Sequence, residues 1–281
     1  MQEIIISNPN IEEIKSAIKK DGAGNLHILT DFDRTLIRAF INGESIPSVL
    51  SILYNENRLT PDYGPKAQEL HKKYSAIEFN PKIPKNEKKK AMYEWWTKHF
   101  DLLIESGLNK KDIENIVNSN KIVFRDGFSE FVEMLKTNNI PLVIMSSSGL
   151  GGDSIRISLE REKKMYDNIH IISNSFKWDE NGRAISIKQP IIYGMNKDET
   201  LIQDFPEIFK KIKNRKNVIL LGDSVDDVGM VVGFDYSNLI KIGFLNDRVE
   251  ENLENYKKTF DVIILNDGSL ELINNLLKEI I

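Results

Sequence analysis

The sequence predicts an α/β fold in which a parallel sheet is flanked by helices, with a mostly helical segment inserted after the first strand. From residue 128 onward, short apolar runs of strand character alternate with amphipathic helical stretches. Such alternation is typical of parallel sheets covered on both faces. Between residues 42 and 125 the alternation stops, and prolines at 47, 61, 65, 81 and 84 interrupt helical stretches. We therefore expect a core of residues 1–41 and 126–281 and a helical insert of residues 42–125.

The composition is that of an ordinary soluble globular protein. The chain has 281 residues, 41% hydrophobic and 28% charged, which suits one large domain or two smaller ones. A net charge of −4 gives no general attraction to nucleic acid or to anionic membranes. Cysteine is absent from the sequence, which excludes disulfides, thiolate nucleophiles and cysteine zinc sites and suits a reducing compartment.

Targeting and membrane signals are not found in the sequence. The first residues lack a basic region followed by a long apolar one, and no apolar run approaches the ~20 residues that a membrane span needs. We therefore expect a cytoplasmic monomer that binds neither a membrane nor a nucleic acid polymer.

The first predicted strand follows an amphipathic helix. Apolar residues at 11, 14 and 18 predict a helix over residues 9–20, which ends at the glycine-containing turn 21–24. A short apolar run starting at Leu26 then has strand character and stops at Thr30.

Within the insert, residues 88–106 form a long helical pattern with an apolar stripe. An aromatic stripe of this kind is more often core than ligand contact. The residues on the stripe are Met92, Trp96 (or Trp95), Phe100 and Leu103. The preceding segment, residues 80–90, is rich in proline and lysine and predicts a solvated surface loop.

The second half of the chain supplies the remaining elements of the core. An Asn181-Gly182 step inside the loosely alternating residues 176–193 predicts a hairpin. The other predicted elements are a helix from Phe128, strands at 142–145, 169–173, 217–224, 239–244 and 260–265, a helix at 153–164 and a terminal helix.

Two aspartates follow the first strand directly. If strand geometry persists to Asp33, its carboxylate and that of Asp31 lie on the same side of the chain. Two buried like charges need a cation, a helix N-terminus or a basic side chain nearby. A turn in which Asp33 or Thr35 caps the next helix is an equally good interpretation of this segment alone.

Polar groups of a consistent kind follow four predicted strand ends or loops. Taken singly, each is more often structural than functional, but together and in this order they indicate a phosphoryl-transfer site at the carboxyl edge of the sheet. The groups are Asp31, Asp33 and Thr35; Ser146, Ser147 and Ser148; Lys197; and Asp223, Asp226 and Asp227.

The oxygen atoms in this set match the ligands that Mg²⁺ prefers. We expect the carboxylates of Asp31 and Asp223 and the backbone carbonyl of Asp33 to bind the ion, with Asp227 reaching it directly or through water. Asp31 can then attack phosphorus, while the Asp33 carboxyl first protonates the leaving oxygen and later deprotonates water.

The phosphate oxygens need separate partners. Ser146 and backbone amides near Ser147 are expected to hold them, and Lys197 to balance their charge. Ser146 is favoured as the residue at the strand end, with Ser147 next.

With these motifs the chain resembles the haloacid-dehalogenase-like (HAD) phosphatases, whose motifs are DxDxT, a strand-end serine, a lysine and GDSxxD. Within them it is most similar to the cytosolic 5′-nucleotidase III (pyrimidine 5′-nucleotidase) family. The resemblance covers nearly the whole chain in collinear order. Its segments are LTDFDRTL (29–36), KYSAIE (73–78), EWWTK (94–98), IMSSSG (144–149), ISNSFKWDENG (172–182), MNKDE (195–199), VILLGDSVDD (218–227) and KIGFLNDRVEENLENY (241–256).

The resemblance implies a HAD-like core whose helical insert forms a cap over the catalytic edge. It also implies that Glu78 contacts the base of a nucleotide and that Trp96 stacks on it. The family usually has Ser and then His after the EW-aromatic-TK segment, where this chain has His99 and Phe100. We include His99 and Thr35 among the candidate substrate-binding residues.

The resemblance implies a magnesium-dependent 5′-nucleotidase that hydrolyses nucleoside 5′-monophosphates, with UMP and CMP favoured. A specificity for 7-methylguanosine monophosphate is the first alternative, because a ring face attracts its positively charged base. Another HAD small-metabolite phosphatase, or a phosphotransferase, would use the same catalytic residues. A catalytically silent nucleotide sensor is the alternative from a different class.

Overall fold

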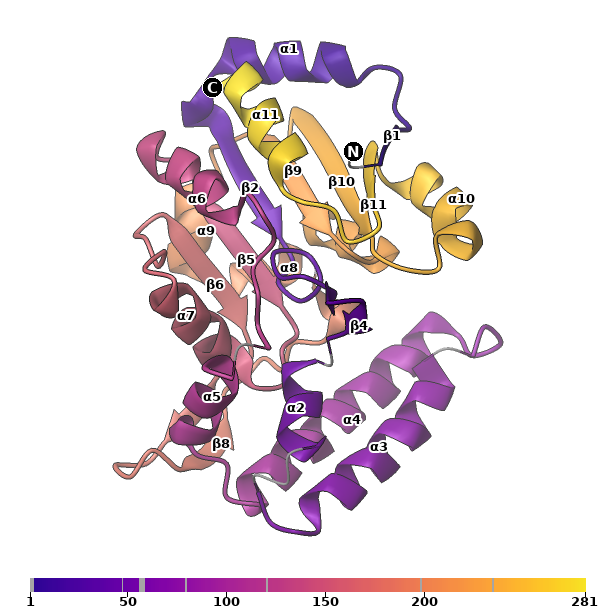
Figure 1. The fold of residues 1–281 in the computed structure, drawn as a ribbon, viewed down its shortest axis with the longest axis vertical. Helices are drawn as coiled ribbons and strands as arrows, with labels where there is room; N and C mark the ends of the chain where they lie inside the picture. Colours follow the sequence, from indigo (N-terminus) through magenta and orange to yellow (C-terminus); the bar gives the residue numbers. More distant parts are fainter. Residues whose placement is uncertain are drawn as a thin grey trace.

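The structure, a computed structural model, describes residues 3–46, 48–55, 59–78, 80–119, 121–197, 199–233 and 235–281. A central sheet with helices on both faces occupies one part of the molecule, and α2, α3 and α4 lie beyond one end of that sheet (Figure 1). Among the described residues the main sheet has seven strands in the order β1-β11-β10-β9-β2-β5-β6. The predicted α/β fold is therefore confirmed.

The main sheet is parallel except at one edge, where β1 pairs antiparallel with β11. Strand β1 was not expected from the sequence, and the other six strands match predicted runs. The strands are β1 (Ile4–Ile6), β2 (Leu26–Thr30), β5 (Leu142–Ser146), β6 (Ile169–Ser173), β9 (Asn217–Gly222), β10 (Asn238–Leu245) and β11 (Val262–Leu265).

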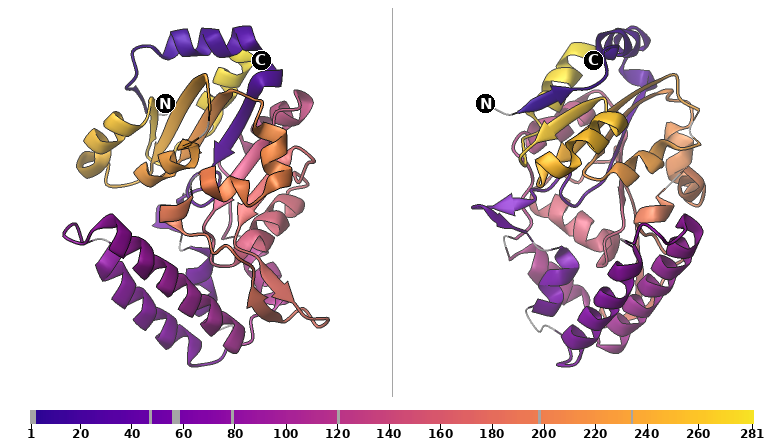
Figure 2. Two further views of the ribbon diagram at one scale, coloured as in Figure 1. Left: turned by 180° about the vertical axis from the view of Figure 1, so that it is seen from behind. Right: turned by 90° about the vertical axis from the view of Figure 1, so that its right-hand side faces the viewer.

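Helices cover both faces of this sheet, as expected for strands that are apolar along their whole length. Ile28 of β2 faces a core shared with helices on one side, and its neighbour Leu29 faces a second core on the other side. The first face packs against α1 (Ile11–Asp21), α6 (Phe128–Thr137), α7 (Gly151–Arg161) and α11 (Glu271–Ile280). The second packs against α8 (Glu199–Gln203), α9 (Pro206–Ile212) and the 3-10 helix Val225–Val231, seen from behind in Figure 2.

In the part of the chain that the structure describes, two short hairpins stand outside the main sheet. The predicted hairpin is confirmed as β7 (Phe176–Trp178) and β8 (Ala184–Ile187), and Gly182 in its turn has a φ of 76°. The second hairpin, β3 (Phe40–Ile41) with β4 (Glu44–Ser45), comes just before the helical insert. Helix α10 (Val249–Thr259) packs near β10 and β11 in a separate small apolar cluster.

Residues 42–125 contain mostly helix, in agreement with the sequence. The helices are α2 (Val49–Asn55), α3 (Tyr63–Glu78), α4 (Lys85–Glu105) and α5 (Lys110–Val117). Helices α3 and α4 run side by side as a long pair in Figures 1 and 2. Helix α5 packs instead on α7, so the insert also contacts the outer helices of the core.

The prediction of a surface loop over residues 80–90 is wrong in its second half. Helix α4 already begins at Lys85, after Pro84 in the N-cap position. Proline is tolerated there because the first helical N–H groups have no intrahelical partner, so it marks the start of the helix here and does not prevent it. Within the described ranges, none of the helices combines the length and the apolar composition that crossing a bilayer requires.

Candidate active site

The two aspartates of the first motif lie just past the carboxyl end of β2. The strand ends at Thr30, and the Asp31 amide still donates to the Leu221 carbonyl of β9 over 3.0 Å. The chain then turns through Arg34, whose φ is 59°. Asp31 is therefore fixed by the sheet, while Asp33 sits in the turn that follows.

Lys197 joins two of the predicted acidic residues. Its Nζ lies 2.6 Å from an Asp31 carboxylate oxygen and 2.8 Å from an Asp227 carboxylate oxygen. All three side chains are buried, so water does little to screen these interactions. Lys197 comes from the loop before α8, far from both aspartates in the sequence, and the fold brings the three together as predicted.

Asp227 is itself held by the turn after β9. Its second carboxylate oxygen accepts hydrogen bonds from the amides of Asp223 (3.1 Å) and Ser224 (3.0 Å). The close approach requires glycine at 222, because a Cβ there would lie 2.5 Å from the Cβ of Asp227. The GDSVDD turn thus holds Asp227 in place, as the hydrogen bond to β9 holds Asp31.

The geometry fits a divalent cation. One carboxylate oxygen from each of Asp31, Asp223 and Asp227 lies within 4.8 Å of the others. Asp31 and Asp227 are buried and Asp223 is half-buried. These three carboxylates face the Lys197 ammonium group and, at Asp223, the Arg34 guanidinium, which Asp247 shares, so negative charge is in excess. Hard oxygen ligands grouped in this way are what magnesium binds.

The pKa values of the carboxyl groups reflect this crowding. Burial, followed by the neighbouring acidic groups, raises the pKa of Asp31, although Lys197 opposes the change. The same causes raise the pKa of Asp223 to about 7. Burial raises the pKa of Asp33 to about 6, which suits a carboxyl group that has to give and take a proton near neutral pH.

The serine turn after β5 lies beside this cluster. The strand ends at Ser146, whose hydroxyl accepts a hydrogen bond from the Ser148 amide over 3.1 Å. Ser146 is thus the serine at the strand end, as favoured from the sequence. The Ser148 carbonyl in turn accepts from the Asn174 side chain (3.3 Å), a residue that sequence reasoning missed.

A cavity of about 290 Å³ connects the two parts of the predicted site. Asp33, Ser147 and Ser148 line one end of it, and Trp96 and His99 of α4 line another wall. Close packing sets its shape, because a Cβ on Gly149 would lie 2.8 Å from Leu50 and 3.1 Å from the Trp96 ring. The loop after β5 is therefore in contact with both α2 and α4.

The wall formed by α3 and α4 is aromatic. The Trp96 ring stacks on Phe100 at 5.5 Å and on Trp95 at 5.7 Å between centroids. His99 is buried, which lowers its pKa to about 4 and keeps its ring neutral, and its Nε2 lies 3.2 Å from the Tyr63 hydroxyl. Met92, Phe100 and Leu103 of the predicted stripe are core residues, whereas Trp96 borders the cavity.

Four of the candidate substrate-binding residues lie outside this cavity lining. Ser146 and Lys197 are at the strand end and in the acidic cluster described above, and the other two are Glu78 and Thr35. Glu78 is at the end of α3, half-buried, and its pKa is raised by burial and then by Asp226. Thr35 is fully buried, its carbonyl accepts from Arg125 over 2.7 Å, and its hydroxyl has no hydrogen-bond partner among the described residues.

Several residues at the site were not predicted from the sequence. His71 and Trp95 line the cavity, and the Tyr256 hydroxyl donates to the carbonyl of Asp223. The Arg34 guanidinium approaches the Asp223 carboxylate at 3.5 Å. Arg34, Trp95 and Tyr256 lie in segments of family resemblance, and Trp95 was also the alternative to Trp96 on the aromatic stripe, whereas His71 had no sequence signal.

The comparisons with known proteins agree with this geometry. The family model described as pyrimidine 5′-nucleotidase (UMPH-1) matches residues 34–281. A 7-methylguanosine phosphate-specific 5′-nucleotidase from Rattus norvegicus is 35% identical over 272 residues, covering 96% of this chain and 90% of the relative. A putative cytosolic 5′-nucleotidase 3 from Caenorhabditis elegans is 33% identical, covering 96% of this chain and 73% of the relative.

Solved structures show the same fold. The crystal structure of cytosolic 5′-nucleotidase IIIB bound to cytidine superimposes with a TM-score of 0.89 at 29% identity, covering 99% of this chain and 93% of that one. A HAD family hydrolase from Salmonella enterica superimposes with a TM-score of 0.56 at 17% identity, a likeness of fold alone. The family model and these relatives together show that the chain belongs to the pyrimidine 5′-nucleotidase (UMPH-1) family.

Proposed function

We propose that the protein is a magnesium-dependent 5′-nucleotidase that hydrolyses nucleoside 5′-monophosphates to nucleoside and phosphate. One observation carries the proposal. A single cavity has Trp96 on its wall and Asp33 and the Ser147 turn at its end, next to the cluster of Asp31 and Lys197. The aromatic wall offers a surface for a base, and the polar end offers partners for a phosphate.

The metal would be held by the carboxylates of Asp31 and Asp223, the backbone carbonyl of Asp33, and Asp227 directly or through water. The grouping of carboxylate oxygens within 4.8 Å supports this ligand set. Magnesium would supply positive charge that offsets the carboxylates and the phosphate oxygens.

The carboxylates then have separate roles. An Asp31 oxygen forms a bond to phosphorus as the bond to the 5′ oxygen breaks, and the protonated Asp33 gives its proton to that leaving oxygen. Asp33 next takes a proton from water, whose oxygen attacks phosphorus and releases Asp31. The pKa of about 6 for Asp33 supports both transfers.

The phosphoryl oxygens would be held by the Ser146 hydroxyl, by amides near Ser147 and by the ammonium group of Lys197. Lys197 lies 2.6 Å from Asp31, so a group attached to Asp31 would be next to this cation. The position of Ser146 at the end of β5 supports its assignment.

The base would stack on Trp96, with His99 beside it. Stacking on an aromatic ring contributes roughly 1–3 kcal/mol per base, enough to orient the nucleotide. Glu78 remains a proposed base contact on the family resemblance alone, since it does not line the cavity.

UMP and CMP are the proposed substrates, and 7-methylguanosine monophosphate is a second candidate. Two features favour this second candidate. Among the described residues, the cavity lining includes no lysine or arginine that would repel its positively charged base, and Trp96 offers a ring face that attracts it. The relative from Rattus norvegicus also bears the name of a 7-methylguanosine phosphate-specific enzyme.

Steady-state rates of phosphate release with UMP, CMP, 7-methylguanosine monophosphate and phosphoserine, with and without magnesium, test the proposal. We expect magnesium-dependent release from the nucleotides and little from phosphoserine. The ratio of kcat/KM for UMP or CMP to kcat/KM for 7-methylguanosine monophosphate shows whether the enzyme prefers a pyrimidine or a 7-methylguanine base. Equal or faster release from phosphoserine would overturn the nucleotidase assignment, and saturable nucleotide binding without any release would favour a sensor.

A further inference from the structure

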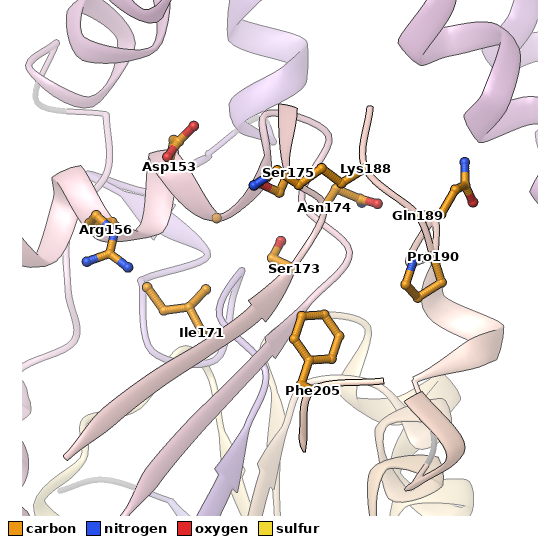
Figure 3. A pocket seen from close by; sticks show the side chains of 11 residues that line it. Asp153, Arg156, Ile171, Ser173, Asn174, Ser175, Lys188, Gln189, Pro190 and Phe205 are labelled. Atoms are coloured by element: carbon orange, nitrogen blue, oxygen red, sulfur yellow. The ribbon is translucent and has the colours of Figure 1, made fainter. Parts of the chain in front are cut away.

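A second cavity, of about 250 Å³, lies at the carboxyl end of β6. It is bounded by the start of α7, the end of β6, the segment 188–190 and Phe205 (Figure 3). It shares no lining residue with the cavity that holds Trp96. The two are neighbours through Asn174, which lines the second cavity and donates to the Ser148 carbonyl of the first.

The charge at this cavity is net positive. Arg156 and Lys188 border it, and neither forms an ion pair with a carboxylate in the part of the chain that the structure describes. The one acidic residue in the lining, Asp153, accepts a hydrogen bond from the indole N–H of Trp178 over 2.9 Å. The cavity also lies at the start of α7, the positive end of its helix dipole.

A buried hydroxyl in the wall lacks a partner. Ser173 is only 8% exposed, and its Oγ forms no hydrogen bond within the described ranges. In Figure 3 this side chain lies between Arg156 on one side and Lys188 and Phe205 on the other. A buried polar atom left unsatisfied costs free energy, so a ligand that hydrogen-bonds to it would gain from the contact.

Part of the wall is apolar, beside the polar Asn174, Ser175 and Gln189. Ile171, Pro190 and the Phe205 ring face the same space as the cations. An inorganic ion would leave this surface without a partner, whereas a compound with an anionic group and a ring or short carbon body would contact both parts.

We propose that this cavity is a second ligand site, which binds a small organic phosphate or phosphonate apart from the catalytic centre. Arg156 and Lys188 hold its anionic group, Ser173 donates a hydrogen bond to it, and Phe205 packs against its body. The site is distinct from the nucleotide cavity, because none of these residues lines that cavity.

Trp178 makes the proposal directly testable, because it is hydrogen-bonded to the cavity lining. The chain has three tryptophans, and the other two border the nucleotide cavity. Fluorine NMR of the full chain labelled with 5-fluorotryptophan therefore reports on both cavities at once, with Trp178→Phe assigning the third resonance. The probes are inorganic phosphate and phenylphosphonate, which the enzyme cannot hydrolyse, in the presence of EDTA.

We expect phenylphosphonate to shift the Trp178 resonance saturably and at concentrations about tenfold lower than inorganic phosphate, since its ring buries apolar surface. The double variant Arg156→Ala, Lys188→Ala should raise the half-saturating concentration at least about tenfold for Trp178 and leave the Trp95 and Trp96 shifts unchanged. The double variant Lys19→Ala, Lys258→Ala, with the same change in charge, should behave as the unaltered protein.

Ser173→Ala tests the hydroxyl separately and should weaken binding about fivefold while leaving the fold intact, because it removes an unsatisfied group. The proposal is overturned if the Trp178 resonance does not move, if it moves without saturation, or if it saturates equally in the Arg156→Ala, Lys188→Ala variant. Shifts confined to Trp95 and Trp96 would likewise show that the nucleotide cavity is the place where these anions bind.

Discussion

At the carboxyl edge of the sheet the functional side chains are positioned by charge, whereas on the wall formed by α3 and α4 they are positioned by ring packing. We call the first set, Asp31, Lys197, Asp223 and Asp227, the catalytic edge, and the second set, His71, Trp95, Trp96 and His99, the aromatic wall. Lys197 contacts Asp31 and Asp227 at 2.6 and 2.8 Å. Trp96 is held by stacking on Trp95 and Phe100.

Under the proposed function, the catalytic edge carries out the reaction and the aromatic wall recognises the base. Buried charges have a narrow choice of geometry, because each displaced or missing partner is costly. The sheet holds Asp31, the turn after β9 holds Asp227, and Lys197 joins the two. Stacked rings tolerate changes in size and angle at a lower cost. We therefore expect substitutions at the edge to abolish the reaction and substitutions at the wall to change the choice of base.

The largest effect should come from Asp31→Asn. An amide cannot act as the nucleophile, so kcat should fall by roughly 10⁴-fold or more. The matched control is Asp226→Asn, which removes an exposed carboxylate from the GDSVDD turn and should leave kcat close to that of the unaltered protein. Comparable kcat values for the two variants would show that Asp31 is not the nucleophile.

Lys197→Met should have the largest effect on stability. It leaves Asp31 and Asp227 buried without their cation, which should lower the free energy of unfolding by about 3–5 kcal/mol in urea titrations without a metal. Magnesium should then raise the midpoint more in this variant than in the unaltered protein, because it replaces the lost positive charge.

The control for Lys197→Met is Lys216→Met. Lys216 forms a 2.6 Å ion pair with the exposed Asp235, and such surface pairs contribute at most about 1 kcal/mol. If both substitutions lowered the free energy of unfolding by the same amount, buried charge would not be what holds the catalytic edge together.

Trp96→Ala should affect recognition and leave the chemical step largely intact. Loss of stacking should raise KM roughly 10–100-fold with little change in kcat, and Trp96→Phe should restore most of the affinity. Tyr93→Ala, on an exposed side of the same helix, is the control and should leave KM unchanged. A drop in kcat alone would place Trp96 with the catalytic edge.

The smallest predicted effect is the loss of folding stability at acidic pH that is due to His99. Burial lowers its pKa from 6.5 to about 4 in the folded protein, so below pH 6.5 the unfolded chain binds more protons. The contribution of His99 to the free energy of unfolding is complete above pH 6.5 and is lost as the pH falls toward 4. Between pH 7 and pH 5 that loss is about 2 kcal/mol.

In His99→Gln this part of the pH dependence should disappear. The measurement is the difference between urea unfolding free energies at pH 7 and pH 5, compared between the variant and the unaltered protein. An unchanged difference would mean that His99 is not held neutral in the wall.

The catalytic edge was predictable from the sequence because of the topology of parallel sheets. Asp31, Asp223 and Ser146 each follow an apolar strand, and the carboxyl ends of parallel strands meet at one edge. Lys197 has no such strand before it; its place in the series of polar groups indicated it, and the family motif then agreed. The structure brings carboxylate oxygens of Asp31 and Asp223 within 4.8 Å of one another, as the prediction required.

The remaining features depend on contacts that local patterns do not encode. Strand β1 has only three residues, and it forms a strand because β11 offers a free edge. Asn174 lies in the resemblance segment 172–182 but was assigned no role there, and its contacts come from lying between Ser148 and Ile192 in space. Whether Glu78 or His71 borders the cavity is decided by how α3 packs on α4, which the spacing of apolar residues does not determine.

The proposed mechanism requires that Asp31 is transiently phosphorylated during turnover. Sodium borohydride reduces an aspartyl-phosphate to homoserine, so quenching the enzyme with borohydride during turnover of CMP with magnesium, followed by peptide mass spectrometry, tests it directly. We predict homoserine at position 31, only when both nucleotide and magnesium are present. Reduction at another residue, or none at all while phosphate is being released, would contradict this mechanism.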